Sequence, residues 1–357
     1  MTRSASSSGG RTLGRVGEWR LLEKLVPRLP GAGDPRFLVG PGDDAAVFRA
    51  RPGTSAWVVT TDMLVEGVHF DLRWTSPEDL GWKSLAVNLS DLAAMGGARP
   101  ALAVIAAGLP ASTGVAFVER FYRGVGKLAR RYGLAVAGGD TVRADKMVIS
   151  PAVLGEWPRG RRILRRSGAR AGDVLMSTGT LGDAAAGLKI LQSRGTGILP
   201  VLSAAGKTAH GQDARATEAE RFLAPRLLRP EPRLDLAGKI SQVTGVTAMM
   251  DSSDGLWRSA RILARASGVG IRIESALLPL SNSLRAWAGK KASGFALFGG
   301  EDYELVLTAR PRAARALEER GWARPVGHVT EGKEVEVVPD IPGRSEAYGF
   351  EHFDQGV

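Results

Sequence analysis

Several aspartates of this chain stand in short runs of small or apolar residues, most of them beside glycine. Asp91 lies in Ala-Val-Asn-Leu-Ser-Asp-Leu-Ala-Ala-Met-Gly-Gly, where it is the only charged residue. An ionised carboxylate buried in such surroundings is costly unless it is paired or binds a metal ion. We therefore expect Asp91 to have a chemical task. The same pattern recurs in four other segments, at residues 42–46, 60–63, 138–141 and 249–255.

These five segments carry one kind of chemistry. If they meet in the fold, their carboxylates repel one another, and the site must bind positive charge. Hard oxygen ligands suit Mg²⁺, which proteins commonly hold through a few carboxylates together with the phosphates of a substrate. The sequence therefore predicts a magnesium-nucleotide site.

The segments between the acids alternate between strand-like and helical patterns in the first half. Residues 57–64 are expected to form a strand that carries Asp62, and Asp91 is expected late in a helix over residues 77–94 that Ser76 caps. Asp140 is expected just after a strand, at a Gly-Gly turn where backbone can approach a ligand. The remaining expected elements are strands at 101–109, 134–137 and 147–155 and a helix at 115–132. This alternation predicts an α/β or α+β domain whose sheet is covered by helices.

The second half repeats the pattern and begins after an Arg-rich connector. A strand within residues 172–179 opens it, and a short strand at 247–250 is expected to deliver Asp251. Residues 195–217 are small and polar and are predicted to be an inserted loop. The other expected elements are helices at 181–191, 218–228 and 256–266 and a strand at 270–274. The predicted organisation is a disordered tail at 1–16, a first domain at 17–156 and a second domain at 157–357.

Composition narrows the class of protein. The chain has 357 residues and a formal charge of +11, which favours anionic partners such as nucleotides. It has no cysteine, so disulfides, thiolate metal sites and cysteine nucleophiles are excluded. Basic residues do not interleave with aromatic ones as in single-strand nucleic-acid grooves, and no apolar run is long enough to span a membrane. We expect a cytoplasmic protein that binds neither nucleic acid nor membrane.

Taken together, the motifs resemble those of the thiamine-monophosphate kinases, in the superfamily of aminoimidazole ribonucleotide synthetase and selenophosphate synthetase. The resemblance extends from about Gly17 to Phe353. It implies a two-domain α/β fold that dimerises through its first domains, and ATP-dependent phosphorylation of thiamine monophosphate to thiamine diphosphate. The motifs that carry it are Gly-Asp-Asp-Ala-Ala-Val, Thr-Thr-Asp-Met-Leu-Val-Glu-Gly-Val-His-Phe, Val-Asn-Leu-Ser-Asp-Leu-Ala-Ala-Met-Gly, Gly-Gly-Asp-Thr, Asp-Ser-Ser-Asp-Gly and Gly-Gly-Glu-Asp-Tyr-Glu-Leu.

The resemblance implies a set of magnesium ligands and a smaller set of catalytic acids. The implied metal ligands are Asp44, Thr60, Thr61, Asp62, Asp91, Asp140, Asp251 and Asp254, and Asp43 is a further candidate outside this set. Asp44, Asp91, Asp140 and Asp254 are the implied catalytic acids. A single Asp-Gly is as often a simple turn, but five such segments make that reading unconvincing. No general base is predicted, because the attacking phosphate is already an anion.

The resemblance also implies contacts to the two substrates. Those to ATP are Tyr122, Gly138, Gly139, Arg166 and Ser253, and those to thiamine monophosphate are His69, Glu301 and Phe350. A carboxylate at Glu301 suits a cationic heterocycle, and an aromatic face suits it as well. Tyr348 is an alternative to Phe350, a solvated charge is an equal alternative for Arg166, and a structural role is the default for His69.

Two other functions stay open at this point. The first is the ring closure of aminoimidazole ribonucleotide synthetase, which uses ATP on the same fold, although the motifs at 87–92 and 299–305 favour the kinase. The second is a nucleotide-binding protein without turnover. Such a protein has little need for so many carboxylates facing phosphate, so the acids argue for an enzyme.

Overall fold

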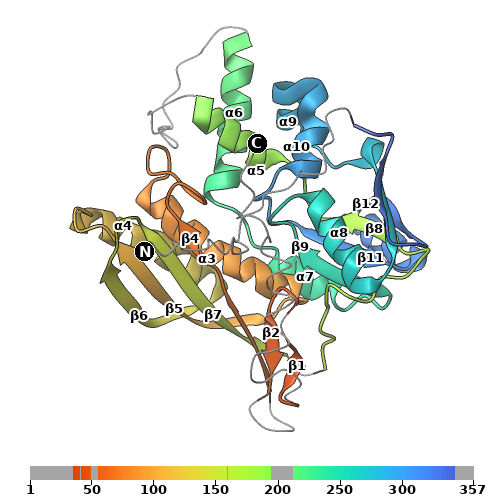
Figure 1. Cartoon of the computed structure of the whole chain (residues 1–357), viewed down its shortest axis with the longest axis horizontal. Helices are drawn as coiled ribbons and strands as arrows, with labels where there is room; N and C mark the ends of the chain where they lie inside the picture. The colour runs from red at the N-terminus through yellow and green to blue at the C-terminus, as the bar shows by residue number, and fades with distance from the viewer. Residues whose placement is uncertain (1–34, 41, 50–54, 159, 194–211, 342–357) are drawn as a thin grey trace, which may run out of the picture.

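The computed structural model describes residues 35–40, 42–49, 55–158, 160–193 and 212–341, and within them the chain forms two β-sheets with helices around them (Figure 1). The first sheet has the strand order β1-β2-β3-β7-β5-β6, and β4 pairs with β7. All pairs in it are antiparallel except β5 with β6. Its strands are β1 Phe37–Val39, β2 Ala46–Phe48, β3 Ala56–Thr61, β4 Leu64–Val65, β5 Arg99–Leu109, β6 Ala135–Arg143 and β7 Val148–Trp157.

The second sheet is built entirely from the second half of the chain. Its order is β13-β10-β12-β8-β11-β9, and only β10 and β13 are parallel. Its strands are β8 Val174–Ser177, β9 Val246–Asp251, β10 Gly270–Glu274, β11 Leu305–Ala309, β12 Arg324–Thr330 and β13 Val335–Val338. Every residue of β11 is buried, because neighbouring strands pair with both of its edges and packed elements cover it.

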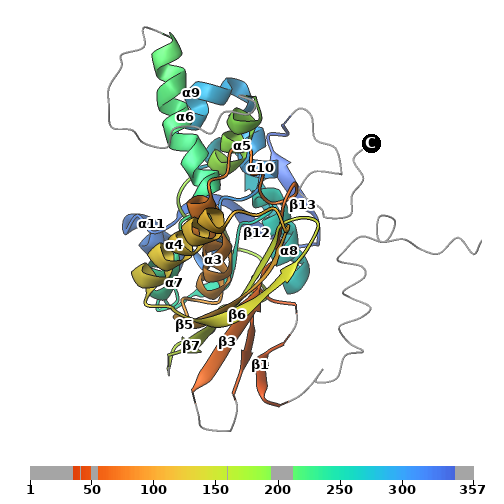
Figure 2. The ribbon, with the colours of Figure 1, turned by 90° about the vertical axis from the view of Figure 1, so that its left-hand side faces the viewer.

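Helices cover one face of the first sheet and surround the second. Figure 2 shows α3 and α4 together on the same side of the first sheet. Their bounds and those of the other helices are α3 Pro77–Ala94, α4 Val115–Tyr132, α5 Asp183–Ser193, α6 Gln212–Leu228, α7 Leu234–Ile240, α8 Leu256–Ser267, α9 Asn282–Ala288, α10 Ala292–Phe298 and α11 Pro311–Glu319, with short 3₁₀ turns at Ser275–Leu277 and Gly289–Lys291.

Helix α3 is the central element of the molecule. It begins at Ser76, whose hydroxyl accepts a hydrogen bond from the Asp79 amide, and Pro77 occupies its first turn. Most of its residues are buried, and it packs against strands of both sheets. A helix that is apolar on nearly all sides belongs in the interior, between layers. Polar side chains on the buried length of α3, such as those of Ser90 and Asp91, are therefore placed between the two halves of the chain.

Close packing of α3 on α4 depends on two glycines. A Cβ at Gly81 would lie 2.0 Å from the Phe121 carbonyl oxygen, and one at Gly124 would lie 2.0 Å from that of Glu78. Neither position has room for a side chain, so the helix backbones approach each other directly. This contact fixes the depth at which α3 lies beneath α4.

The predicted fold class is confirmed, and several elements match closely. The expected helices over 77–94 and 115–132 coincide with α3 and α4. The expectation that Asp140 follows a strand is wrong, because β6 continues through Gly138 and Gly139 in parallel register with β5. The predicted loop at 195–217 is wrong at its end, since α6 begins at Gln212. The tail at 1–16, most of that loop, Tyr348 and Phe350 lie outside the described residues.

Candidate active site

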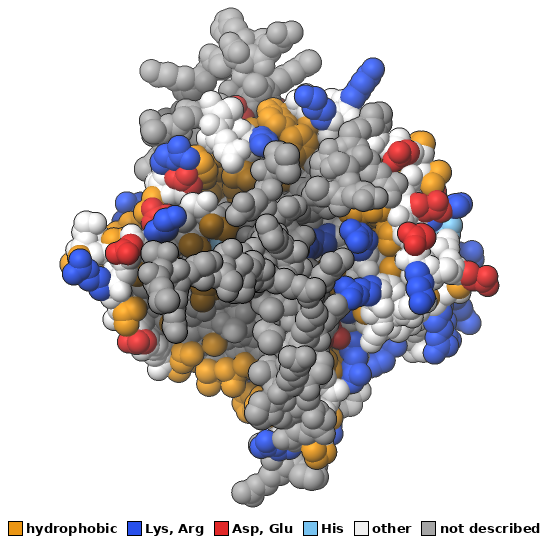
Figure 3. Space-filling view, viewed as in Figure 1, with side chains coloured by type: hydrophobic (Ala, Val, Ile, Leu, Met, Phe, Trp, Pro, Cys, Tyr) orange, Lys and Arg blue, Asp and Glu red, His pale blue; other side chains and the backbone are white. Residues whose placement is uncertain are grey.

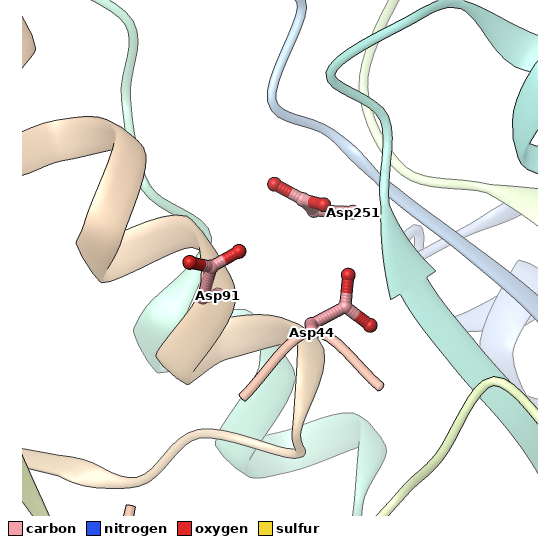
Figure 4. Close-up of side chains that lie close together, drawn as sticks. All are labelled: Asp44, Asp91 and Asp251. Carbon is pink, nitrogen blue, oxygen red and sulfur yellow. The ribbon is translucent and has the colours of Figure 1, made fainter. Parts of the chain in front are cut away.

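Three carboxylates from distant parts of the sequence converge between the two sheets (Figure 4). Asp44 lies between β1 and β2, Asp91 lies near the end of α3, and Asp251 is the last residue of β9. One carboxylate oxygen of each lies within 4.8 Å of the others. Asp44 and Asp251 are buried, and Asp91 is partly buried. The predicted meeting of these three segments is therefore present in the structure.

Hydroxyl groups hold two of these carboxylates in place. The Thr60 hydroxyl on β3 donates to Asp91 Oδ2 at 2.5 Å. The Ser90 hydroxyl on α3 donates to Asp251 Oδ2 at 2.6 Å, although 161 residues separate the two. Each carboxylate keeps an oxygen that these hydroxyls do not contact. The arrangement orients the acids and leaves acceptor oxygens for a ligand.

Burial and mutual repulsion dominate the electrostatics of this group. Burial raises the pKa of Asp91 well above its usual range, and the charges of Asp62, Asp251 and Asp44 raise it further. Burial and the charge of Asp44 likewise raise the pKa of Asp251 well above its usual range. Carboxylates that repel one another in a buried site stabilise a bound cation strongly, because it removes both penalties.

Asp62 and Asp254 extend the group. Burial, together with the charges of Glu301, Asp44 and Asp254, raises the pKa of Asp62 to about 6. The Asp62 amide donates to the buried Asn88 side chain at 3.1 Å, which ties the end of β3 to α3. Asp254 forms an ion pair with Arg258, one turn along α8, at 3.4 Å.

Arg166 supplies positive charge at the edge of the group. Its guanidinium donates to both oxygens of Asp44, at 2.9 and 3.2 Å, and its amide donates to Asp43. Burial lowers the pKa of Arg166, but the charge and hydrogen bonds of Asp44, together with the charges of Asp251 and Asp43, more than offset burial and raise the pKa above its usual value. Burial and the charge of Asp44 raise the pKa of Asp43 to about 6. Arg166 therefore lies in the site rather than on a solvated surface.

The donor set suits a hard divalent cation. Every side-chain ligand atom in the close group is a carboxylate oxygen, with hydroxyl oxygens beside them. Mg²⁺ prefers such oxygen ligands, and the chain has no thiolate to attract softer metals. The Thr61 hydroxyl points elsewhere, because it donates to the Pro151 carbonyl on β7 at 2.9 Å. A side-chain role for Thr61 as a ligand is therefore not supported by this arrangement.

A second set of predicted residues lies on β6 and α4. Asp140 is exposed, and its carboxylate accepts a hydrogen bond from the Thr141 amide at 2.9 Å. It is not among the acids that lie within 4.8 Å of one another in the described chain. Tyr122 is 41% exposed and lines a small cavity together with Thr141. The structure thus places Gly138, Gly139 and Asp140 on the outer strand β6 of the first sheet, and Tyr122 of α4 lies beside Thr141 of the same strand.

The residues expected to contact the acceptor meet at a buried lysine. Lys83 on α3 donates to the His69 carbonyl at 2.9 Å and forms an ion pair with Glu301. His69 Nδ1 accepts a hydrogen bond from the Val65 amide at 3.1 Å, so the neutral ring carries its proton on Nε2. The Ser253 carbonyl accepts a hydrogen bond from the Glu301 amide at 2.6 Å. His69, Glu301 and Ser253 are therefore brought together.

Sequence reasoning missed two contributors to this site. Ser90 adjoins Asp91 in the sequence but contacts Asp251, and no pattern in the sequence indicates that contact. Lys83 had a usable signal, because it is the only Lys or Arg between residues 77 and 94, in an otherwise buried helix. The argument that assigned a task to Asp91 applies equally to a buried ammonium.

Family models match nearly the whole described chain. The model for the N-terminal domain of AIR synthase related proteins matches residues 42–157, and the model for their C-terminal domain matches residues 170–340. The thiamine-monophosphate kinase of Synechococcus elongatus is 36% identical, over 96% of this chain and 98% of that protein. That of Bacillus subtilis is 35% identical, over 94% of this chain and 99% of that protein.

Solved structures agree with the sequence comparisons. A structure described as AaThiL complexed with AMPPCP and TMP matches with a TM-score of 0.80 and 36% identity. The match covers 97% of this chain and 100% of the AaThiL chain. The hydrogenase maturation protein HypE of E. coli has a TM-score of 0.59 at 21% identity, a likeness of fold alone. In the part of the chain that the structure describes, no helix is both long and apolar enough to cross a membrane.

Proposed function

The chain belongs to the thiamine-monophosphate kinases, a family of AIR synthase related proteins, and we propose that it transfers the γ-phosphoryl group of ATP to thiamine monophosphate. A phosphate oxygen of thiamine monophosphate forms the new bond to the γ-phosphorus. The bond from that phosphorus to the bridging oxygen of ADP breaks, and the products are thiamine diphosphate and ADP. The convergence of Asp44, Asp91 and Asp251 in a chain so similar to a protein solved with AMPPCP and TMP carries this proposal.

Magnesium is the cofactor that the acid group fits. We assign Asp44, Asp91 and Asp251 to it first, because their oxygens already lie close together. Asp62 and Asp254 adjoin them, and Thr60 orients Asp91. A magnesium ion held by these residues would supply Lewis-acid chemistry and would neutralise the charge of the phosphates.

The residues of the chain itself position the carboxylates and balance charge in the site. Thr60 and Ser90 hold the carboxylates of Asp91 and Asp251 at fixed angles, so little rearrangement is needed when a cation binds. Arg166 balances Asp44 in the structure, and its guanidinium fork suits a phosphate as well as a carboxylate. No general base is required, since the attacking phosphate oxygen is anionic near neutral pH and in-line alignment is the main task.

The nucleotide contacts are assigned to the neighbourhood of β6. Gly139 has no room for a side chain, because its Cβ would lie 1.9 Å from the Ile105 carbonyl oxygen, and Gly138 has a φ of 147°. Gly139 is thus required by the close approach of β5, whereas nothing would lie within 4 Å of a Cβ at Gly138, so a phosphate can approach the backbone there closely. We propose that Tyr122, Gly138 and Gly139 contact ATP with Asp140 beside them as a metal ligand, and that Ser253 contacts ATP from the second domain.

The acceptor contacts are assigned to the region around Lys83. His69 and Glu301 face each other across that ammonium, one from each half of the chain. The carboxylate of Glu301 suits the cationic thiamine portion, and its side chain remains 25% exposed. Phe350 is still proposed to stack on the thiamine rings, although it lies outside the described residues.

A homodimer formed through the first domains completes the proposal. β6 is a long strand at the edge of its sheet, and all of its residues are exposed. Hydrophobic side chains gather over this part of the surface, at the lower left of Figure 3, and Val104, Val136 and Val142 on β5 and β6 are among the exposed ones. A second copy of the chain would cover them. We also propose a domain boundary near residue 156 and a cytoplasmic enzyme without nucleic-acid partners.

The test is release of ADP by the purified protein with Mg-ATP. Four reactions are compared: thiamine monophosphate, thiamine, formylglycinamidine ribonucleotide and no acceptor, with the product identified by mass. Thiamine diphosphate formed only from thiamine monophosphate supports the proposal. Ring closure of the ribonucleotide would move the chain to the synthetase reaction, and silence with all acceptors would favour a nucleotide-binding protein without turnover.

A further inference from the structure

Lys83 is a buried cation in the middle of α3. Its side chain is 3% exposed, whereas that of Lys127 on α4 is 46% exposed. A buried ammonium is costly unless partners satisfy its charge and its N–H groups. The partners of Lys83 therefore indicate why a lysine occupies this position in a helix that is otherwise apolar or small on most sides.

The Lys83 ammonium contacts two loops from different halves of the chain. It donates to the His69 carbonyl oxygen, at 2.9 Å, in the loop that follows β4. It also forms an ion pair with Glu301, in the loop that precedes β11. One ammonium thus joins these two loops.

The loop that carries Glu301 is independently held in an unusual conformation. Glu301 has a φ of 71° and Tyr303 a φ of 51°, in the left-handed region that side chains rarely adopt. Their amides donate to the carbonyls of Ser253 and Ser252, at 2.6 and 3.0 Å. Such backbone persists where surrounding contacts over-determine it, and it directs the attached side chain. Here it directs the Glu301 carboxylate onto Lys83.

Glu301 also lies within electrostatic reach of the acid group. Its charge contributes to the raised pKa of Asp62, after burial, and to that of Tyr303. A carboxylate in this position would be repelled by the acids beside it without a cation of its own. Lys83 supplies that cation from the helix that also carries Ser90 and Asp91.

We propose that Lys83 is a positioning residue for the acceptor: it holds the Glu301 carboxylate and the His69 loop in place before the cationic thiamine portion binds. This inference rests on the proposed function, in which Glu301 and His69 contact the acceptor. Preorganisation of this kind lowers the ordering cost of binding and acts on one substrate only. Tyr122, Gly138 and Gly139, the ATP contacts of the first domain, lie on α4 and β6, away from Lys83. Ser253 is joined to the Glu301 loop through the Glu301 amide, not through the carboxylate that Lys83 holds.

The principal test is Lys83→Met, which keeps an apolar side chain and removes the charge. The KM for thiamine monophosphate is expected to rise by at least about tenfold, while the KM for ATP stays within about twofold of the wild-type value. Binding of thiamine monophosphate in the presence of a non-hydrolysable ATP analogue, measured by calorimetry, should weaken in parallel. An unchanged KM for thiamine monophosphate, or equal losses for both substrates, would overturn the inference.

Lys127→Met is the matched control. Lys127 also forms an ion pair with a glutamate, Glu78, but on the surface of the same domain. Exposed pairs contribute little, so both KM values are expected to match those of the wild type. A rise in the KM for thiamine monophosphate as large as that of Lys83→Met would show that loss of any lysine pair has this effect, and would also overturn the inference.

A double variant keeps the test decisive if Lys83→Met does not fold. Removal of Lys83 leaves Glu301 as an unpaired carboxylate among other acids, and Glu301→Gln relieves that penalty. The double variant is expected to bind thiamine monophosphate as weakly as Glu301→Gln alone, because Lys83 acts through Glu301. A further, independent loss would overturn the inference. If the wild type phosphorylates thiamine monophosphate and Lys83→Met has an unchanged KM for it, only this inference is contradicted. If the wild type does not bind thiamine monophosphate, the proposed function is contradicted as well.

Discussion

At the scale of single residues, the site is defined by carboxylates that are costly to ionise. Burial and repulsion raise the pKa of both Asp91 and Asp251, and Arg166 is paired chiefly with Asp44. Ionising them in the absence of a cation is therefore unfavourable, and the divalent cation proposed above would relieve that repulsion. Removing one of these charges has opposite effects on stability and on turnover.

Asp91→Asn tests that relation. Turnover at saturating Mg-ATP is expected to fall by at least about tenfold, as when one electrostatic contact to a transition state is lost. The thermal midpoint of the magnesium-free variant is expected to equal or exceed that of the wild type, because a buried, repelled charge is gone. Steady-state kinetics and thermal unfolding without magnesium measure the two effects. Asp340→Asn, at an exposed carboxylate of the second domain, is the control; wild-type rates in Asp91→Asn would contradict the assignment.

Asp302 gives a prediction about pH. Burial raises its pKa to about 8, although the amides of Gly182 and Ala184 donate to its two oxygens and oppose the rise. The unfolded chain releases that proton at about pH 4, so the folded state binds the extra proton between about pH 4 and about pH 8. Stability is therefore expected to fall as pH rises through this window, and Asp62 adds to the trend up to about pH 6.

Urea unfolding at several pH values, with magnesium removed, checks the direction. Asp302→Asn cannot ionise and is expected to show a shallower slope, and slopes rather than absolute stabilities are compared because an amide loses one accepted hydrogen bond. Stability that rises with pH across the window would contradict the prediction.

The sequence was informative about individual acids for a physical reason. A carboxylate among apolar residues is costly, so Asp44, Asp91 and Asp251 could be identified without knowledge of their partners. Their partners could not, because the contact of Ser90 with Asp251 depends on how α3 packs against β9. Lys83 was missed although the same argument applied to it. The roles assigned to Asp140, Tyr122 and the glycines of β6 remain predictions.

At the scale of elements, the position of α3 determines where the site lies. It places Lys83, Ser90 and Asp91 between the sheets, and its own position depends on the glycine contacts with α4. Helices α3 and α4 could be predicted closely because caps and periodicity are local signals. The extent of β6 could not, because Gly138 and Gly139 look like a turn, whereas pairing with β5 keeps them extended. Tertiary pairing overrode the local preference.

Gly81→Ala tests the role of the contact between the two helices. A Cβ there would overlap the Phe121 carbonyl, so the helices must move apart, and overpacking of this kind typically costs about 1–3 kcal/mol or more. Because Asp91 lies on the moving helix, affinity for magnesium is expected to fall as well. Chemical denaturation and magnesium titration followed by tryptophan fluorescence measure both.

Gly294→Ala is the matched control within a helix. Gly294 lies in α10, and nothing would lie within 4 Å of its Cβ. This substitution is expected to leave magnesium affinity unchanged and to stabilise the protein by up to about 1 kcal/mol through helix propensity. If Gly81→Ala proved as harmless as Gly294→Ala, the helix contact would not control the site.

At the scale of the whole molecule, the long exposed edge strand β6 requires an explanation. Edge strands with exposed apolar side chains pair with other chains unless something covers them. Val142 is 55% exposed and lies on this strand. The homodimer proposed above would cover it and would also enclose the neighbourhood of Gly138, Gly139 and Asp140.

Val142→Asp tests the dimer. A charge within the apolar surface of β6 is expected to shift the protein towards a monomer, with sedimentation velocity as the measurement. Leu277→Asp is the control, since Leu277 is 45% exposed but lies in the second half of the chain. A monomeric wild type, or an unchanged dimer in Val142→Asp, would contradict the proposed interface.

The hydrogen bond between Ser90 and Asp251 has a consequence for how the chain folds during synthesis on the ribosome. Asp44, Asp62 and Asp91 emerge early, but Asp251 and Glu301 emerge only after most of the chain has been synthesised. Until then Ser90 lacks its acceptor, Lys83 lacks its counter-ion, and the three early acids face one another without the second sheet. Polar groups of the nascent first domain therefore lack their final hydrogen-bond and ion-pair partners. We expect this domain to gain its final rigidity only when the second domain packs over α3.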